Sequence, residues 1–300
     1  MILVAGGTGT LGTELVPLLS ARGLGVRVLT RDPSRATHLP DTVETITGDI
    51  QDEATVTAAI QGCRTVISAV HGFAGAGKQS DRQSPESIDR DANLALIQAA
   101  VAAGVEHFVL ISVQGAAPDH PMSLHRTKYA AEQALVASSL QWTIIRPTAY
   151  LETWTGIIGA KIASSGQAQV FGPGHNPNNF VSARDVATIV DLAVNDQSLR
   201  GQTVDATGEN LTFTEIAERM LAGSGKPGKI KRIPLPMLRM MSVLARPISP
   251  MFARQAHAAV VMNTTDMTAD VDATRHRFPA MRVSTLDDVL TEQQTQLRYR

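Results

Sequence analysis

The chain has 300 residues, and 27 Lys and Arg nearly balance 28 Asp and Glu, which leaves a net charge of −1. At roughly 150 residues per domain, this length fits one large domain or two that share the chain. The 43% hydrophobic content supports a large core and excludes global disorder. The lack of a basic excess and the 4% aromatic content disfavour a nucleic-acid partner.

The apolar start, Met1–Ala5, is too short for a signal peptide, and glycines follow it directly. The longest apolar candidate, Leu235–Met262, is interrupted by arginines and prolines, so we expect no membrane span. The single cysteine, Cys63, excludes an intramolecular disulfide and fits a reducing compartment. We therefore expect a cytoplasmic protein.

Short apolar runs alternate with helical patterns through the first half of the chain. The runs predict strands at Ile2–Ala5, Val26–Leu29, Val43–Thr47, Val66–Val70, Phe108–Ile111 and Thr143–Ile145, and the patterns between them predict helices at Leu11–Ala21, Glu53–Ile60, Asp89–Ala103 and Leu124–Ser138. Nearly continuous apolar strands indicate a sheet covered on both faces. The alternation predicts an α/β fold with a doubly wound parallel sheet.

After Pro147 the alternation becomes irregular. We expect residues 1–150 to form a nucleotide-binding domain that also receives 179–207. Most of 151–300 would form a smaller, discontinuous lobe that binds the substrate. Within this lobe an adaptable apolar surface fits a substrate entrance, an oligomer contact or ordinary core packing, and comprises Met237, Leu238, Met240, Met241, Leu244, Met251 and Phe252.

The strongest motif is the glycine-rich run at 6–12, which follows the first strand and opens a helix. Glycines at such a turn let the backbone approach a pyrophosphate, and the free amides of the helix start bind its oxygens. The strand–turn–helix context makes a dinucleotide site the favoured interpretation over a merely tight turn. The predicted cofactor-binding residues here are Gly6, Thr8, Gly9, Thr10, Leu11 and Gly12.

The residues at the end of the second strand indicate whether such a site binds NAD(H) or NADP(H). Arg31 lies where an acidic residue would bond the ribose of NAD, and Arg35 follows one helical turn later. Guanidinium groups suit a 2′-phosphate. We therefore prefer NADP(H) over NAD(H), although Asp32 between the arginines favours the opposite choice.

Two further strand ends contribute to the predicted cofactor site. Asp49 and Ile50 follow the third strand, where the adenine would lie, although Asp49 fits a loop-capping role equally well. The small side chains of Ser68, Ala69 and Val70 end the fourth strand and leave room for the phosphates and ribose. The polar stretch that follows, 72–90, fits a flap over the cofactor or a plain loop.

The chain resembles the NmrA-like branch of the atypical short-chain dehydrogenases/reductases. The matching pieces, over roughly the first 190 residues, are the glycine run, Thr30-Arg31, Gly48-Asp49, Asn93, Phe108–Ser112, Lys128, Arg146-Pro147 and the segment 180–187. The resemblance implies an NAD(P)-binding Rossmann fold with a C-terminal substrate lobe. Its members include quinone and isoflavone-type reductases and some redox sensors that bind the cofactor without turnover.

The resemblance also supplies catalytic candidates and a departure from the family pattern. Ser112 fits the family's serine position, and Lys128 fits its lysine position, which implies binding of the nicotinamide ribose or proton donation by Lys128. Leu124 stands where classical members have a proton-donating tyrosine. His125 is an alternative acid, with a plain surface position favoured for it. Pro147 ends the sixth strand, where the nicotinamide is expected, and is predicted to contact the cofactor. Tyr150 follows it and is the third catalytic candidate.

These observations predict an NADP(H)-dependent oxidoreductase that transfers hydride to a small apolar acceptor such as a quinone or an enone. The alternatives are a non-catalytic NADP(H)-binding sensor, favoured by the missing tyrosine, and, less favoured, a sugar-nucleotide epimerase or dehydratase. The histidines show no metal-ligand spacing, so no metal is expected. The expected partner is a small-molecule substrate, and the expected state is a monomer or homodimer.

Overall fold

The computed structural model describes residues 1–72, 84–224 and 228–298. The chain divides into two compact units. One comprises Met1–Pro147 and Val186–Ala206, and the other comprises Thr148–Asp185 and Thr207–Arg300. We describe each unit by itself.

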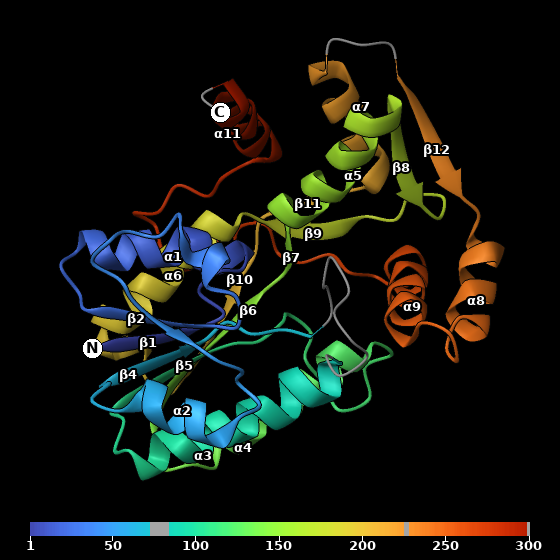
Figure 1. Ribbon diagram of the computed structural model, residues 1–300. Coiled ribbons are helices and arrows are strands. Elements are labelled where there is room, and N and C mark those ends of the chain that lie inside the picture. The colour runs from blue at the N-terminus through green and yellow to red at the C-terminus, as the bar shows by residue number, and fades with distance from the viewer. Residues whose placement is uncertain (73–83, 225–227, 299–300) are drawn as a thin grey trace. The chain divides into compact units, whose positions relative to one another are not determined.

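The first unit is built on a parallel sheet (Figure 1). Among the described residues its strands are β1 (Ile2–Ala5), β2 (Val26–Thr30), β3 (Glu44–Thr47), β4 (Thr65–Ser68), β5 (His107–Ile111), β6 (Gln141–Pro147) and β10 (Gln202–Ala206). The strand order is β10-β6-β5-β4-β1-β2-β3, and every neighbouring pair is parallel. The order reverses direction between β1 and β4, which is where ligands bind in such sheets. The predicted doubly wound α/β class is confirmed.

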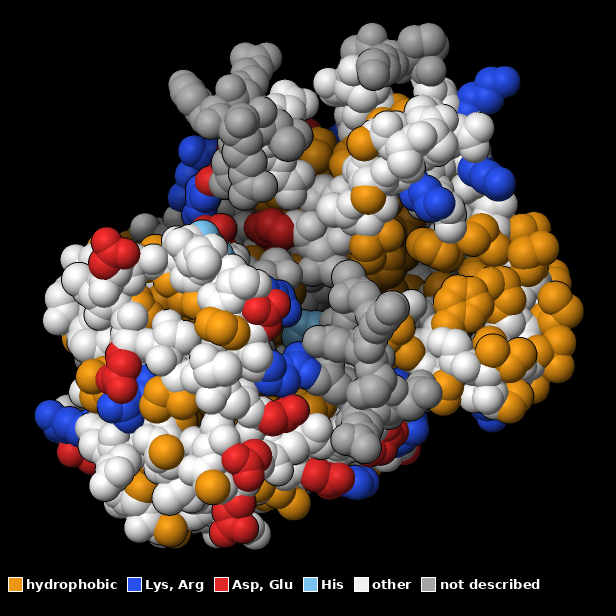
Figure 2. Space-filling view, viewed as in Figure 1, with side chains coloured by type: hydrophobic (Ala, Val, Ile, Leu, Met, Phe, Trp, Pro, Cys, Tyr) orange, Lys and Arg blue, Asp and Glu red, His pale blue; other side chains and the backbone are white. Residues whose placement is uncertain are grey.

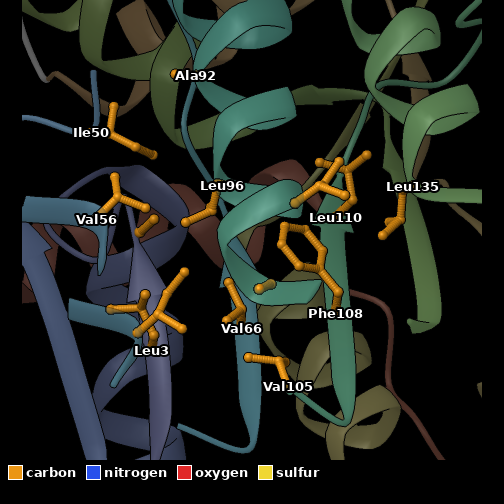
Figure 3. Close-up of a cluster of buried hydrophobic side chains, with 14 of the residues drawn as sticks. Leu3, Ile50, Val56, Val66, Ala92, Leu96, Val105, Phe108, Leu110 and Leu135 are labelled. Carbon is orange, nitrogen blue, oxygen red and sulfur yellow. The ribbon is translucent and has the colours of Figure 1, made fainter. Parts of the chain in front are cut away.

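Helices cover both faces of this sheet (Figure 1). On one face lie α1 (Thr10–Ala21) and α6 (Ala183–Asn195), joined by an ion pair between Arg22 and the buried Asp191 at 2.5 Å. On the other face lie α2 (Glu53–Ile60), α3 (Asn93–Ala102) and α4 (Ser123–Val136). Figure 3 shows the core on this second side, where Leu96 and Phe108 lie among aliphatic side chains from the sheet and the helices. Both side chains are fully buried.

The helix predicted at Asp89–Ala103 is longer and less regular than expected. It begins with a π-helical segment, η2 (Pro85–Ala92), which continues into α3. The buried amide of Asn93 lies at the junction and donates to the carbonyl oxygens of Ile88 (3.3 Å) and Asp89 (3.0 Å). These bonds tie the Asn93 side chain to the last turn of the π-helical segment, and π-helical turns are frequent at functional sites. The earlier part of the suggested flap, 73–83, lies outside the described residues.

The second unit combines small sheets with helices. Its elements are β7 (Ala149–Tyr150), α5 (Leu151–Ser165), β8 (Gln167–Phe171), β9 (Asn178–Val181), β11 (Glu209–Leu211), α7 (Phe213–Gly223), β12 (Lys229–Ile233), α8 (Leu235–Leu244), α9 (Pro250–Thr264), α10 (Ala273–Arg277) and α11 (Leu286–Arg298). β9 pairs with β7 and β11, and β8 pairs with β12. Phe180, Phe213 and Trp154 pack together in its core.

The structure adjusts the predicted boundaries of the units. We expected 179–207 to return to the first unit, but only Val186–Ala206 does so, because β9 joins the small sheet of the second unit. The substrate-binding role expected for the second unit stays a prediction. None of the described helices has the length and apolar character needed to cross a bilayer.

Candidate cofactor and active site

The glycine loop joins β1 to α1 and closes tightly against the end of β4. Gly6 has a φ of +89°, and a Cβ there would lie 2.6 Å from the carbonyl oxygen of Ala69. A Cβ on Gly12 would lie 2.3 Å from the carbonyl carbon of Gly7. Glycine is therefore required at both positions, since backbone atoms occupy the space of any side chain.

The amino end of α1 is built to receive an anion. Its N-cap is Gly9, so no side chain caps the helix, and no acidic residue stands in its first turn. The amides of the first turn thus have no intrahelical acceptor. Free amides and the positive end of the helix dipole are the groups that bind phosphate in such folds, so the residues present fit the pyrophosphate of a dinucleotide.

The end of β2 presents two exposed arginines and a carboxylate that is already engaged. Arg35 Nη2 donates to the carbonyl oxygen of Thr8 at 3.0 Å, which places its guanidinium against the glycine loop. Asp32 Oδ1 instead accepts from the Ser34 amide (3.0 Å) and hydroxyl (2.6 Å). These bonds hold the pKa of Asp32 below its ordinary value. Asp32 therefore acts as a local cap, and Arg31 stays exposed beside it.

The other predicted cofactor residues have structural roles in this fold. Asp49 accepts a hydrogen bond from the Gln51 amide at 3.0 Å, as expected for a loop cap, and Ile50 is buried in the core (Figure 3). The buried Ser68 hydroxyl donates to Asn93 Oδ1 at 2.6 Å. Contacts of these residues with a cofactor stay predictions.

Lys128 lies in a buried polar cluster at the carboxyl ends of β4 and β5. Its Nζ donates to the carbonyl oxygens of Val70 (2.8 Å) and Ile111 (2.9 Å) and forms an ion pair with Asp89 at 3.0 Å. An ammonium group has three protons to donate. Two of them are donated to backbone carbonyls, and the charge of the ammonium is paired with Asp89, which favours a positioning role for Lys128 over contact with a cofactor.

Asp89 is the site residue that sequence reasoning missed. It is fully buried on η2, and its second carboxylate oxygen accepts from the Gly72 amide at 2.8 Å. Asp89 and Lys128 together join η2 to the loop after β4 and to the end of β5. The only signal in the sequence was an acidic residue within a predicted helix, which is ordinarily exposed.

Two polar side chains near this cluster are buried, each with an atom that has no hydrogen-bond partner among the described residues. They are the Ser112 hydroxyl at the end of β5 and Nδ1 of His125 in the first turn of α4. The His125 ring stacks on His120 with the centroids 3.7 Å apart. Burial, aided by the nearby charge of His120, lowers the pKa of His125 to about 3. His125 is therefore neutral at pH 7, and its expected surface position is wrong.

Tyr150 lies on β7 and so belongs to the second unit, whereas Ser112 and Lys128 belong to the first. Its hydroxyl is buried and has no hydrogen-bond partner among the residues described. Burial, with the charge of Glu152 adding to it, raises the pKa of Tyr150 above its ordinary value. The hydroxyl therefore stays protonated. Pro147 is buried at the end of β6, where its carbonyl oxygen accepts from the Gln114 amide at 2.9 Å.

The fold and the glycine loop define a dinucleotide-binding protein of the doubly wound class. The sequence matches the family described as NAD(P)H-binding over residues 6–197, and the chain belongs to that family. The resemblance to NmrA-like atypical short-chain dehydrogenases/reductases is thereby confirmed.

The chain is similar to proteins with several different names. The NAD(P)H azoreductase of Xenophilus azovorans is 31% identical over 238 residues, which are 78% of this chain and 78% of that protein. The photosystem II assembly factor Ycf39 of Synechocystis is 28% identical over 300 residues, 97% of this chain and 90% of that one. The crystal structure of an NADPH-dependent quinone oxidoreductase from Escherichia coli is similar with a TM-score of 0.74 and 19% sequence identity. The match covers 98% of this chain and 99% of the oxidoreductase chain.

Proposed function

We propose that the protein is an NADPH-dependent reductase that transfers hydride to a small apolar acceptor, such as a quinone, an enone or an azo compound. The observation that carries the proposal is the uncapped amino end of α1, held by the glycine loop where the strand order reverses. Bound NADPH supplies the hydride. The NAD(P)H azoreductase relative supports both the reaction class and an azo acceptor.

The preference for NADPH rests on the end of β2. The carboxylate that would bond the ribose of NAD is engaged by Ser34, and the Arg35 guanidinium lies against the glycine loop. Arg31 is exposed at the same strand end. Two guanidinium groups beside a carboxylate that Ser34 already engages favour a 2′-phosphate over a free hydroxyl.

The acceptor class follows from the groups that this chain offers. In the first unit, the buried Ser112 hydroxyl at the end of β5 is the candidate to donate a hydrogen bond to an acceptor oxygen. It does not release a proton readily, since serine hydroxyls are weak acids. Such a donor suits a quinone, whose reduced oxygen takes its proton from water, better than a ketone that requires a strong acid in the site.

The test is turnover by the purified protein with NADPH or NADH and a panel of one benzoquinone, one enone and one azo dye. We expect loss of the reduced nicotinamide absorbance with at least one acceptor and a higher kcat/KM for NADPH than for NADH. Gly156→Ala serves as the matched control for Gly12→Ala, because a Cβ at Gly156 has nothing within 4 Å. The control should keep turnover and Gly12→Ala should lose it.

A non-catalytic NADPH-binding regulator is the second candidate function. It is favoured by Leu124 at the usual tyrosine position and by the engagement of Lys128 with Asp89. Tight NADPH binding without turnover of any acceptor in the panel would replace the reductase proposal with this one. Failure of both nucleotides to bind would contradict the cofactor site itself.

A further inference from the structure

The outer side of α8 presents an apolar surface. The exposed fractions of its side chains are 46% for Met237, 54% for Met240 and 63% for Leu244. Figure 2 shows hydrophobic side chains gathered over α8 and α9. An exposed apolar cluster of this kind marks an interaction site.

The outward side of α8 is more apolar than that of an ordinary surface helix. Ser242 is buried, and its hydroxyl donates to the carbonyl oxygen of Arg239 at 2.7 Å. Leu238 is also buried, while Val243 is 56% exposed. An ordinary surface helix turns its polar side chains toward water. Core packing, one of the interpretations of this segment, is therefore wrong for the exposed residues.

The connection from α8 to α9 extends this apolar surface. Ile248 is 85% exposed, more than any other large hydrophobic side chain in the described residues, and Phe252 in the first turn of α9 is 40% exposed. We call the set Met237, Met240, Val243, Leu244, Ile248 and Phe252 the α8–α9 patch.

The segment that carries the patch is strongly basic, although the whole chain has a net charge of −1. Between residues 228 and 265 the sequence has no Asp or Glu, and its basic residues are Lys229, Lys231, Arg232, Arg239, Arg246 and Arg254. All of them except Arg254 are exposed. β12, which carries three of them, runs directly into α8 (Figure 1).

We propose that the α8–α9 patch docks the protein onto an anionic lipid surface, with the apolar side chains in the interface and the basic ones at the headgroups. Amphipathic surfaces with this composition bind bilayers through buried apolar area together with attraction to anionic lipids. Each Lys or Arg near such a surface adds to the attraction. This mode lies on the membrane without crossing it and does not rest on the proposed function.

The charge of the segment also argues against a second copy of this chain as the occupant. A two-fold contact places the same patch on both partners. The exposed Arg239 and Arg246 of both copies would then lie in one interface, with no acidic residue of the segment to compensate for their charge. Like charges juxtaposed in an interface oppose association.

The test is flotation of the full chain with vesicles of phosphatidylcholine alone or of phosphatidylcholine and phosphatidylglycerol in equal amounts. We expect binding to the anionic vesicles, weaker binding to the neutral ones, and a loss of binding as salt is raised. Leu244→Asp combined with Ile248→Asp should weaken binding by about tenfold or more, since two inserted apolar groups become charged. Arg239→Glu should weaken it in the anionic vesicles.

Ile157→Asp is the matched control, because Ile157 is 42% exposed in the same unit but lies on α5, outside the basic segment. It should bind vesicles as the wild type does. Absence of binding to anionic vesicles, or equal binding by the double variant, would overturn the proposal. A dimer in light scattering that the double variant dissociates would instead assign the patch to a second copy and overturn it too.

Discussion

The ion pair of Lys128 with Asp89 gives the sharpest prediction at the scale of single residues. Lys128→Met leaves a fully buried carboxylate without its cation, which costs about 3–5 kcal/mol of unfolding free energy. Asp89→Leu should cost a similar amount. The double variant should recover part of the loss, because neither charge then remains unpaired. Urea unfolding of the four proteins measures this coupling.

Turnover of the same variants separates a positioning role from a chemical one. If Lys128 only positions the loop after β4, the double variant regains activity together with stability. A double variant that is stable and binds NADPH but stays inactive would assign Lys128 to the reaction and contradict the positioning role.

The arginines after β2 predict cofactor selectivity. Arg31→Ala and Arg35→Ala should each raise the Kd for NADPH about tenfold, because each removes one charge-assisted contact with the 2′-phosphate. Each should change the Kd for NADH by less than about twofold. Arg64→Ala is the control, since Arg64 is exposed and pairs with Glu106 just before β4 and β5 begin. Equal losses for NADPH and NADH would argue against a 2′-phosphate site.

Two buried histidines predict how stability depends on pH. Burial is the main cause that lowers the pKa of His107 to about 4 and that of His125 to about 3. Below pH ~6.5 these histidines bind protons in the unfolded chain but stay neutral in the folded chain. Each histidine therefore lowers the free energy of unfolding by about 2 kcal/mol between pH 6.5 and 5. Urea unfolding should therefore show a shallower pH slope for His125→Gln than for the wild type. His38→Gln, an exposed control, should keep the wild-type slope.

At the scale of elements, a glycine-to-alanine substitution should lower stability in the β1–α1 turn and raise it in α5. Gly12→Ala should cost about 2–4 kcal/mol of stability and most NADPH affinity, because its Cβ would overlap the Gly7 backbone. Gly156→Ala should raise stability by about 0.5–1 kcal/mol, since it adds a side chain in open space within a helix. Thermal unfolding measures both, and destabilisation by both would contradict the packing of α5.

The elements also show what the sequence was able to predict. Apolar periodicity placed the strands and helices of the first unit, since each must bury a face of its own. It did not reveal the π-helical segment η2, where the Asn93 side chain bonds to the carbonyls of Ile88 and Asp89. It also missed the pairing of β8 with β12, because half-exposed strands carry little apolar pattern and their partners are distant in the chain.

For the whole molecule, the motif predicted the NAD(P)-binding family and the fold correctly, but not the buried network of Lys128 and Asp89. The glycine loop is a local sequence feature and was readily recognised. The ion pair of Lys128 with Asp89 forms only when η2 packs against α4, so no residue spacing in the sequence predicts it. The same holds for the α8–α9 patch, where composition revealed apolar residues and only the fold shows which of them face water.

The central claim, hydride transfer from NADPH held at the glycine loop, is tested most directly by a single turnover. A stoichiometric complex of the protein with NADPH is mixed rapidly with excess benzoquinone, and nicotinamide absorbance and hydroquinone are followed together. We expect the absorbance to be lost and hydroquinone to appear in equal amounts, faster than for NADPH and the quinone alone. Persistence of the absorbance in a saturated complex, with each acceptor class in turn, would contradict it.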